Sequence, residues 1–153
     1  MLGGGNEEVM ETMDEEFSYK VSESGQLTTT GKPPCKLYIG WRHSNPHKFA
    51  EKSVWVVEKD GSVHLLEHHN WHSSDGFEWS YSGSGPADLA LALAWDMWGR
   101  QWALVHHQDL KVAFVQGLPE YAWMMTAIGL TLWRANFQRG CGCEVCGGVP
   151  WVS

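Results

Sequence analysis

Long apolar runs, basic charge and cysteine are all scarce in this chain of 153 residues. No apolar run approaches the roughly 18 residues that a membrane-spanning helix requires, so we expect no membrane contact. Lys and Arg number 11 against 18 Asp and Glu, and a basic face for duplex nucleic acid is therefore not expected. Residues 1–16 show neither the basic nor the apolar region of a secretory signal. We expect a cytoplasmic protein, in which the 4 cysteines are thiols or metal ligands.

Negative charge is concentrated at the N-terminus. Residues 1–16 contain six acids and no Lys or Arg: Glu7, Glu8, Glu11, Asp14, Glu15 and Glu16. The formal net charge of -7 leaves only -1 for the rest of the chain once these acids are removed. Composition predicts a largely disordered acidic arm and linker over residues 1–36. A short amphipathic helix that docks on a partner is the alternative, because Val9, Met13 and Phe17 recur every four residues.

Residues 37–138 are expected to form a single α+β domain. Runs rich in β-branched and aromatic residues predict strands at residues 37–42, 53–59, 62–67, 77–81 and 121–126. Asp60-Gly61 lies between two of these runs and is a strong hairpin signal.

The helices are expected in the second half of this domain. Apolar residues on nearly every face predict a buried central helix that begins near Pro86 and ends at Gly99. Further helices are predicted over residues 100–117 and 127–138. The expected architecture is a small antiparallel sheet of about four to five strands, packed on two or three helices.

A glycine-rich corner at residues 82–88 leads into the central helix and has two interpretations. A helix N-terminus exposes unpaired N–H groups, and glycine lets an anion approach them closely, which predicts a site for a nucleotide-like small molecule. The ligand-binding residues would then be Glu78, Trp79, Tyr81, Ser82, Gly83, Ser84, Gly85 and Asp88. Alternatively, Asp88 caps its own helix and the corner only turns the chain. The Lys-Ser/Thr pair of a phosphate loop is absent.

Histidine is abundant, with 8 residues in the chain. One group comprises His64, His68, His69 and His72, and the pair His106-His107 follows later. In a strand His64 and His68 would face the same side, so a metal-dependent enzyme is one hypothesis. No H-E-x-x-H helix motif supports it, and histidines of loops and of the surface are the alternative.

A Cys- and Gly-rich tail occupies residues 139–153. Cys143 and Cys146 have the C-x-x-C spacing of a zinc knuckle, and Cys141 supplies a third sulfur. A structural zinc site would take its fourth ligand from Cys35, a histidine or a second subunit. A plain tail with reduced thiols is the other interpretation.

Tryptophan is the most unusual excess, with 10 residues in this length. Trp95, Trp98 and Trp102 are expected to fill the core, because large aromatic side chains bury much area. Tryptophans outside the core would enrich a protein–protein face or a homo-oligomer interface. A non-catalytic protein that binds another protein or its own copy therefore joins the hypotheses of a small-molecule binder and a metal-dependent enzyme.

The order of several motifs resembles an uncharacterised family of small phage, plasmid and bacterial proteins. The motifs are Y-x-G-x-R (Tyr38 to Arg42), GFEW-x-Y-x-GSGPADLAL (Gly76 to Leu91), D-x-x-G (Asp96 to Gly99), Q-x-x-K (Gln108 to Lys111) and L-P-x-x-x-W (Leu118 to Trp123). Ser80 and Ser82 stand where the family pattern has glycine. The resemblance implies only a setting, that of an accessory protein of a mobile element in a bacterial host. In this setting the binding hypothesis is that the protein binds a host or phage protein, or its own copy, and modulates host defence.

Overall fold

The computed structural model describes residues 17–139, and within them two antiparallel sheets and three α-helices form an α+β fold, as the sequence predicted. The strands are β2 (Ser18–Val21), β3 (Leu27–Thr30), β4 (Leu37–Arg42), β5 (Lys52–Val57), β6 (Val63–Leu65) and β7 (Ala122–Thr126). The helices are α1 (Ser84–Trp98), α2 (Arg100–Ala113) and α3 (Ala127–Arg139), with short 3-10 turns η2 (Pro46–Lys48) and η3 (Val115–Gly117). No helix in this part of the chain is both long and apolar enough to span a membrane.

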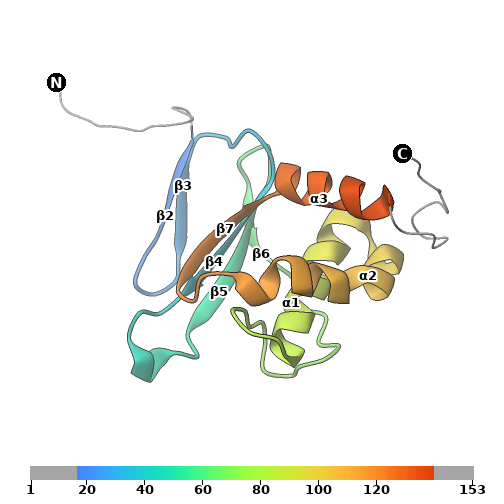
Figure 1. Cartoon of the computed structure of the whole chain (residues 1–153). Coiled ribbons are helices and arrows are strands. Elements are labelled where there is room, and N and C mark those ends of the chain that lie inside the picture. Colours follow the sequence, from blue (N-terminus) through green and yellow to red (C-terminus); the bar gives the residue numbers. More distant parts are fainter. Residues whose placement is uncertain (1–16, 140–153) are drawn as a thin grey trace.

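The larger sheet has the strand order β6-β5-β4-β7 and separates the other elements into two layers. The β2–β3 hairpin lies on one side of this sheet and the helices lie on the other (Figure 1). Alternation along the strands produces this division. Tyr38 and Val56 face the helices, while Ile39 and Val57 belong to a second cluster beneath the hairpin.

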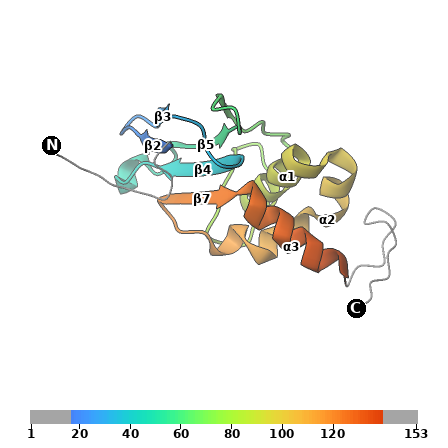
Figure 2. The same cartoon turned by 90° about the horizontal axis from the view of Figure 1, so that it is seen from above.

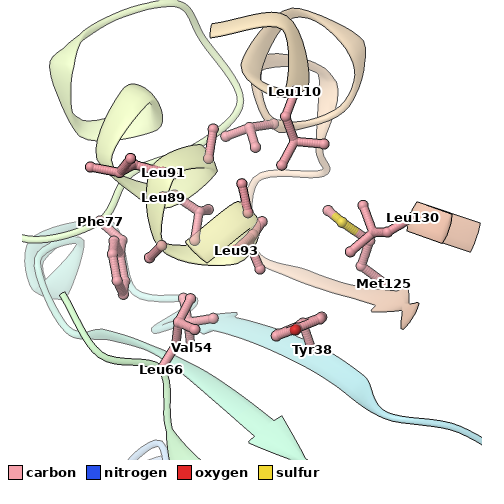
Figure 3. Close-up of a cluster of buried hydrophobic side chains, with 14 of the residues drawn as sticks. Tyr38, Val54, Leu66, Phe77, Leu89, Leu91, Leu93, Leu110, Met125 and Leu130 are labelled. Carbon is pink, nitrogen blue, oxygen red and sulfur yellow. The ribbon is translucent and has the colours of Figure 1, made fainter. Parts of the chain in front are cut away.

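Helix α1 occupies the centre of the main core. Leu89, Leu91 and Leu93 are fully buried, as expected of a helix that is apolar on nearly every face. Figure 3 shows α1 between Tyr38 and Val54 of the sheet and Leu110 of α2. Burying each leucine contributes about 2 kcal/mol of hydrophobic stabilisation, so α1 organises both neighbouring layers.

Two turns were predicted correctly from glycine. Gly61 has a φ of 94° in the β5–β6 hairpin, where Ser62 N–H donates to Asp60 Oδ1 at 2.9 Å. Gly99 has a φ of 93° between α1 and α2, and its N–H donates to Trp95 O at 2.9 Å. Both positions need the left-handed backbone that glycine adopts without strain.

Residues 18–36 differ from the predicted linker, because they contain the β2–β3 hairpin. Trp41 and Trp55 of the main sheet determine its position. The Trp55 indole N–H donates to Gly25 O at 3.0 Å, and the Trp41 ring lies directly against Gly25. Packing on these two rings orders a segment whose composition alone indicates a linker.

Residues 77–81 are also not the predicted strand, since they run as irregular backbone into α1. Ser80 has a φ of 78°, which breaks the extended conformation. Its N–H donates to Val115 O at 3.1 Å and its hydroxyl donates to Leu118 O at 2.6 Å. These bonds hold Ser80 in a left-handed backbone conformation that glycine adopts more easily than serine.

The acidic residues at positions 7–16 and the three cysteines of the tail lie outside the described residues. Their predicted roles therefore stay predictions.

We predict that Gly40→Ala destabilises the fold by about 3 kcal/mol, as overpacking of a full core does. A methyl group at position 40 would meet Trp123 Cε2 at 2.1 Å, and this ring is buried. Urea unfolding measures the loss. Gly117→Ala is the control, because nothing lies within 4 Å of the added carbon there. Equal stability of the two variants would contradict the close packing of Trp123 on β4.

Candidate functional site

Glu78, a predicted ligand-binding residue, lies beside α1 with its carboxylate fully engaged. It forms ion pairs with Arg42 Nη2 and, at 3.3 Å, with Lys52 Nζ. Its side chain also occupies the space above Gly85, where a Cβ would lie 2.7 Å from Glu78 Cβ. Gly85 is therefore required for close packing of the chain, and Glu78 neutralises a buried arginine.

Trp79, another predicted ligand-binding residue, is buried in the core. Its indole N–H donates to Glu120 O at 2.9 Å. The Arg42 guanidinium lies 4.8 Å from the Trp79 ring and 3.8 Å from the Phe49 ring, in a cation–π stack. Three predicted ligand-binding residues precede the corner, namely Glu78, Trp79 and Tyr81. Among them only Tyr81 exposes much of its area, about half.

Asp88 is not the helix cap that the second interpretation predicted. Helix α1 begins at Ser84, so Asp88 lies beyond the first turn, and Gly83 caps the helix without a side-chain hydrogen bond. The buried carboxylate instead accepts from His72 N–H at 2.7 Å and Ser73 N–H at 3.0 Å, and contacts His68 Nε2 at 2.7 Å. Asp88 thus anchors the histidine-rich loop rather than its own helix.

These contacts also determine the protonation of Asp88. Burial alone would raise the pKa of the carboxyl, but the bonds from His68, Ser73 and His72 outweigh it and lower the pKa below its ordinary value of 3.8. The ionised form is therefore the one that holds the loop.

The histidines are brought together in pairs that the sequence did not indicate. His64 pairs with Glu58 at 2.7 Å, away from His68, which lies on Asp88. His72 and His107, from separate histidine groups, approach to 2.8 Å between their Nε2 atoms. His107 Nδ1 donates to Ala103 O at 2.8 Å, so in the neutral pair His72 must be the donor to His107 Nε2.

His106 and His107 are buried in α2, which corrects the expectation of surface histidines. Burial lowers the pKa of His107 below 6.5, and the nearby His72 lowers it further. The neutral ring is therefore favoured, and the His72–His107 pair ties the anchored loop to α2.

No group of three or more His, Cys, Asp or Glu side chains within residues 17–139 is placed to hold a metal ion. The predicted zinc ligands Cys141, Cys143 and Cys146 lie outside this range. Cys35, one candidate for the fourth ligand, is a free thiol packed beside Leu37 and Ile39.

A groove of about 320 Å³ lies on the face of the sheet that carries the hairpin. Tyr19 and Val21 of β2 form one wall, and Ala122 and Met124 of β7 form the opposite wall. The groove exists because the hairpin packs over β4 and β5 and leaves the outer face of β7 uncovered.

Helix α3 follows β7 at the edge of the sheet (Figure 2), and the two segments carry an exposed apolar surface. We call it the β7–α3 surface and define it by Tyr121, Met124, Ile128 and Leu132, which expose 39%, 45%, 55% and 62% of their area. No charged residue occurs from Tyr121 to Trp133. Large exposed apolar side chains gathered on two consecutive elements at the edge of a sheet are typical of an interaction site. The alternation of β7 is visible in the sequence, but its position at an edge is not.

The fold and these sites define a small α+β protein in which buried ionic anchors support an exposed apolar edge. The chain belongs to a family of unknown function (DUF6166), which matches residues 38–135, well over half of its length. Comparisons with curated proteins and with solved structures found no match.

We predict that Asp88→Asn costs about 3 kcal/mol of stability in urea unfolding. The amide retains one acceptor oxygen, but its NH₂ group faces a backbone N–H of His72 or Ser73 and leaves it unpaired. Asp75→Asn is the control, because Asp75 is exposed in the same loop. A loss no greater than that of the control would show that the carboxylate does not anchor the loop.

We predict that His107 makes the protein less stable as the pH falls below 6.5. Its folded pKa lies below 6.5, so the unfolded chain takes up the proton first, and the contribution present above pH 6.5 is lost as the pH falls toward the folded pKa. His107→Gln should therefore reduce the slope of unfolding free energy against pH between about 7 and 5.

His64→Gln is the control for this measurement. The hydrogen bond to Glu58 raises the pKa of His64, so its removal should change the slope in the opposite direction. An unchanged slope in His107→Gln would mean that this imidazole titrates alike in the folded and unfolded chains.

Proposed function

We propose that this protein is a non-catalytic binding protein that engages another polypeptide through the β7–α3 surface. The observation that carries the proposal is an exposed apolar surface, uncharged from Tyr121 to Trp133, on a chain whose formal net charge is -7. Covering an uncharged apolar surface with another protein lowers the free energy, because apolar area leaves water and no charge has to be desolvated.

The arrangement of α3 supports an interface. Leu130, Trp133 and Phe137 pack toward the main core, while Ile128 and Leu132 point to the opposite side of the helix. An ordinary surface helix carries charged or polar residues on its outer face. Here the outer face of the first turns carries Ile128 and Leu132 together with Thr131 and has no charged residue, which favours a second protein as its cover.

The corner before α1 supports binding to a small anion less well. The Glu78 side chain packs against Gly85 through its Cβ and Cγ, and its carboxylate pairs with Arg42 and Lys52. The Trp79 indole is buried and donates to Glu120 O. Both side chains are therefore committed to contacts within the fold and are not available to a ligand at the corner. The histidine-rich loop has a structural role for the same reason, because its contacts with Asp88 and His107 are made within the chain.

The setting of the proposed function follows from the sequence resemblance. An accessory protein of a phage or other mobile element acts in the cytoplasm of its bacterial host and binds a host or phage protein, or a second copy of itself. Modulation of host defence is the activity that this setting suggests for such a binder.

We predict that Leu132→Lys abolishes partner capture while Val112→Lys does not. The two residues are matched in exposure, at 62% and 63%, but Val112 lies on α2, away from the β7–α3 surface. A lysine buried in an apolar interface should weaken binding by about tenfold or more. The experiment compares tagged wild type with both variants in lysate from host bacteria that also express an untagged copy of the chain.

Recovered proteins are quantified by mass spectrometry. A protein recovered with wild type and Val112→Lys, but lost with Leu132→Lys, supports the proposal. Recovery of the same proteins with all three, or of none with wild type, contradicts it.

A further inference from the structure

We propose that the partner at the β7–α3 surface is a second copy of this chain, joined by antiparallel pairing of the two β7 strands about a two-fold axis at Met124. This inference rests on the proposed function and names its partner. The result would be one continuous sheet in which each β7 is an interior strand.

The backbone of β7 presents hydrogen-bonding groups to this partner. Arg42 N–H donates to Tyr121 O and Ala127 N–H donates to Lys36 O, both at 2.9 Å. Because antiparallel ladders alternate, residues 121, 123, 125 and 127 direct their backbone groups toward β4. Ala122, Met124 and Thr126 therefore direct theirs away from the sheet, where no strand within residues 17–139 lies beside β7.

The outward groups match their own copy after a two-fold rotation. With the axis at Met124, the two Met124 residues lie opposite each other as a hydrogen-bonded pair and exchange both bonds. Thr126 N–H of each copy then meets Ala122 C=O of the other. Met124 is also the middle residue of β7, so this centre pairs the whole strand from Ala122 to Thr126, whereas a centre at Trp123 or Met125 leaves one end of it outside the pairing.

The charge of the chain favours a copy that approaches by this edge. Two chains with a formal charge of -7 each repel one another, and six of these charges belong to residues 1–16 of each chain. Strand β7 and the exposed side of α3 that continues it contain no charged residue up to Trp133. A two-fold interface sets each surface against itself, and an uncharged surface is complementary to itself without any like-charge contact.

The opposite edge of the sheet shows the contrast. Strand β6 has only 3 residues and carries His64, which pairs with Glu58. Short length and charge are common means of preventing strand addition. Strand β7 has 5 residues, AWMMT, with neither charge nor proline. The unprotected edge is thus the one that also carries exposed Met124.

Side chains would support the pairing beyond the backbone. Antiparallel register brings Tyr121 of one copy past Thr126 of the other, toward the start of α3 and Ile128. The side chains of Tyr121 and Ile128 are exposed in the single chain, at 39% and 55% of their area. Burial of Tyr121 on Ile128, twice by symmetry, adds apolar contact on each side of the paired strands.

The test uses the purified full chain and two charged variants at the axis, Met124→Lys and Met124→Glu. Light scattering during gel filtration, from the low to the high micromolar range, should give wild type twice the mass of one chain. Each variant alone should be a monomer, since like charges meet at the axis. An equimolar mixture should recover the doubled mass, because only a residue that faces itself allows this rescue. Val112→Lys, on α2, should remain a dimer, and circular dichroism confirms that each variant is folded.

A monomeric wild type over the whole range overturns the inference, as do charged variants that dimerise alone or a mixture that stays monomeric. A monomeric wild type that still captures a host protein, lost in Leu132→Lys, would leave the proposed function standing with a foreign partner. If the mixture recovers the dimer, while Leu132→Lys recovers the same host proteins as wild type, the β7–α3 surface binds only a second copy of the chain.

Discussion

The packing of Trp123 on Gly40 determines how the edge of the sheet is built. The indole ring occupies the space of a side chain at position 40, with Trp123 Cε2 only 2.1 Å from where a Cβ would lie. Gly40 and Trp123 are direct partners in the β4–β7 register, so the ring and the missing side chain define that register together. A shift by one residue would turn Trp123 to the outer face and Met124 into the core. The exposed position of Met124 follows from this contact.

The same ring links the edge to the start of the central helix. Trp123 meets Trp79 edge to face at 5.6 Å, and Trp79 lies beneath the Arg42 guanidinium. Arg42 pairs with Glu78, whose side chain fills the space above Gly85. The glycine-rich corner is therefore one end of a packed chain of contacts that begins at β7. Its glycine and its carboxylate are explained by packing and by neutralisation of a buried cation.

Local signals predicted the parts of the fold that local physics determines. Asp60-Gly61 and Gly99 indicated turns because their backbone needs glycine, and the uniform apolarity of α1 indicated its burial. The β2–β3 hairpin was missed because Trp41 and Trp55, distant in sequence, order it. The strand expected at residues 77–81 failed for a similar reason, since Ser80 is held by bonds to Val115 and Leu118.

The candidate sites were harder to predict from the sequence than the fold, because the role of a side chain depends on which distant residues fold against it. The sequence marks Asp88 as a cap, yet the carboxylate binds a loop that ends more than ten residues earlier in the chain. It marks the run from Tyr121 to Trp133 as a strand and a helix, but only the strand order shows that no other strand of the described part of the chain lies on one side of β7. An apolar segment in the interior of a sheet needs no partner beyond the fold. The same segment at an edge leaves backbone donors and acceptors and apolar area together in water, and a binding partner is the simplest means of covering both.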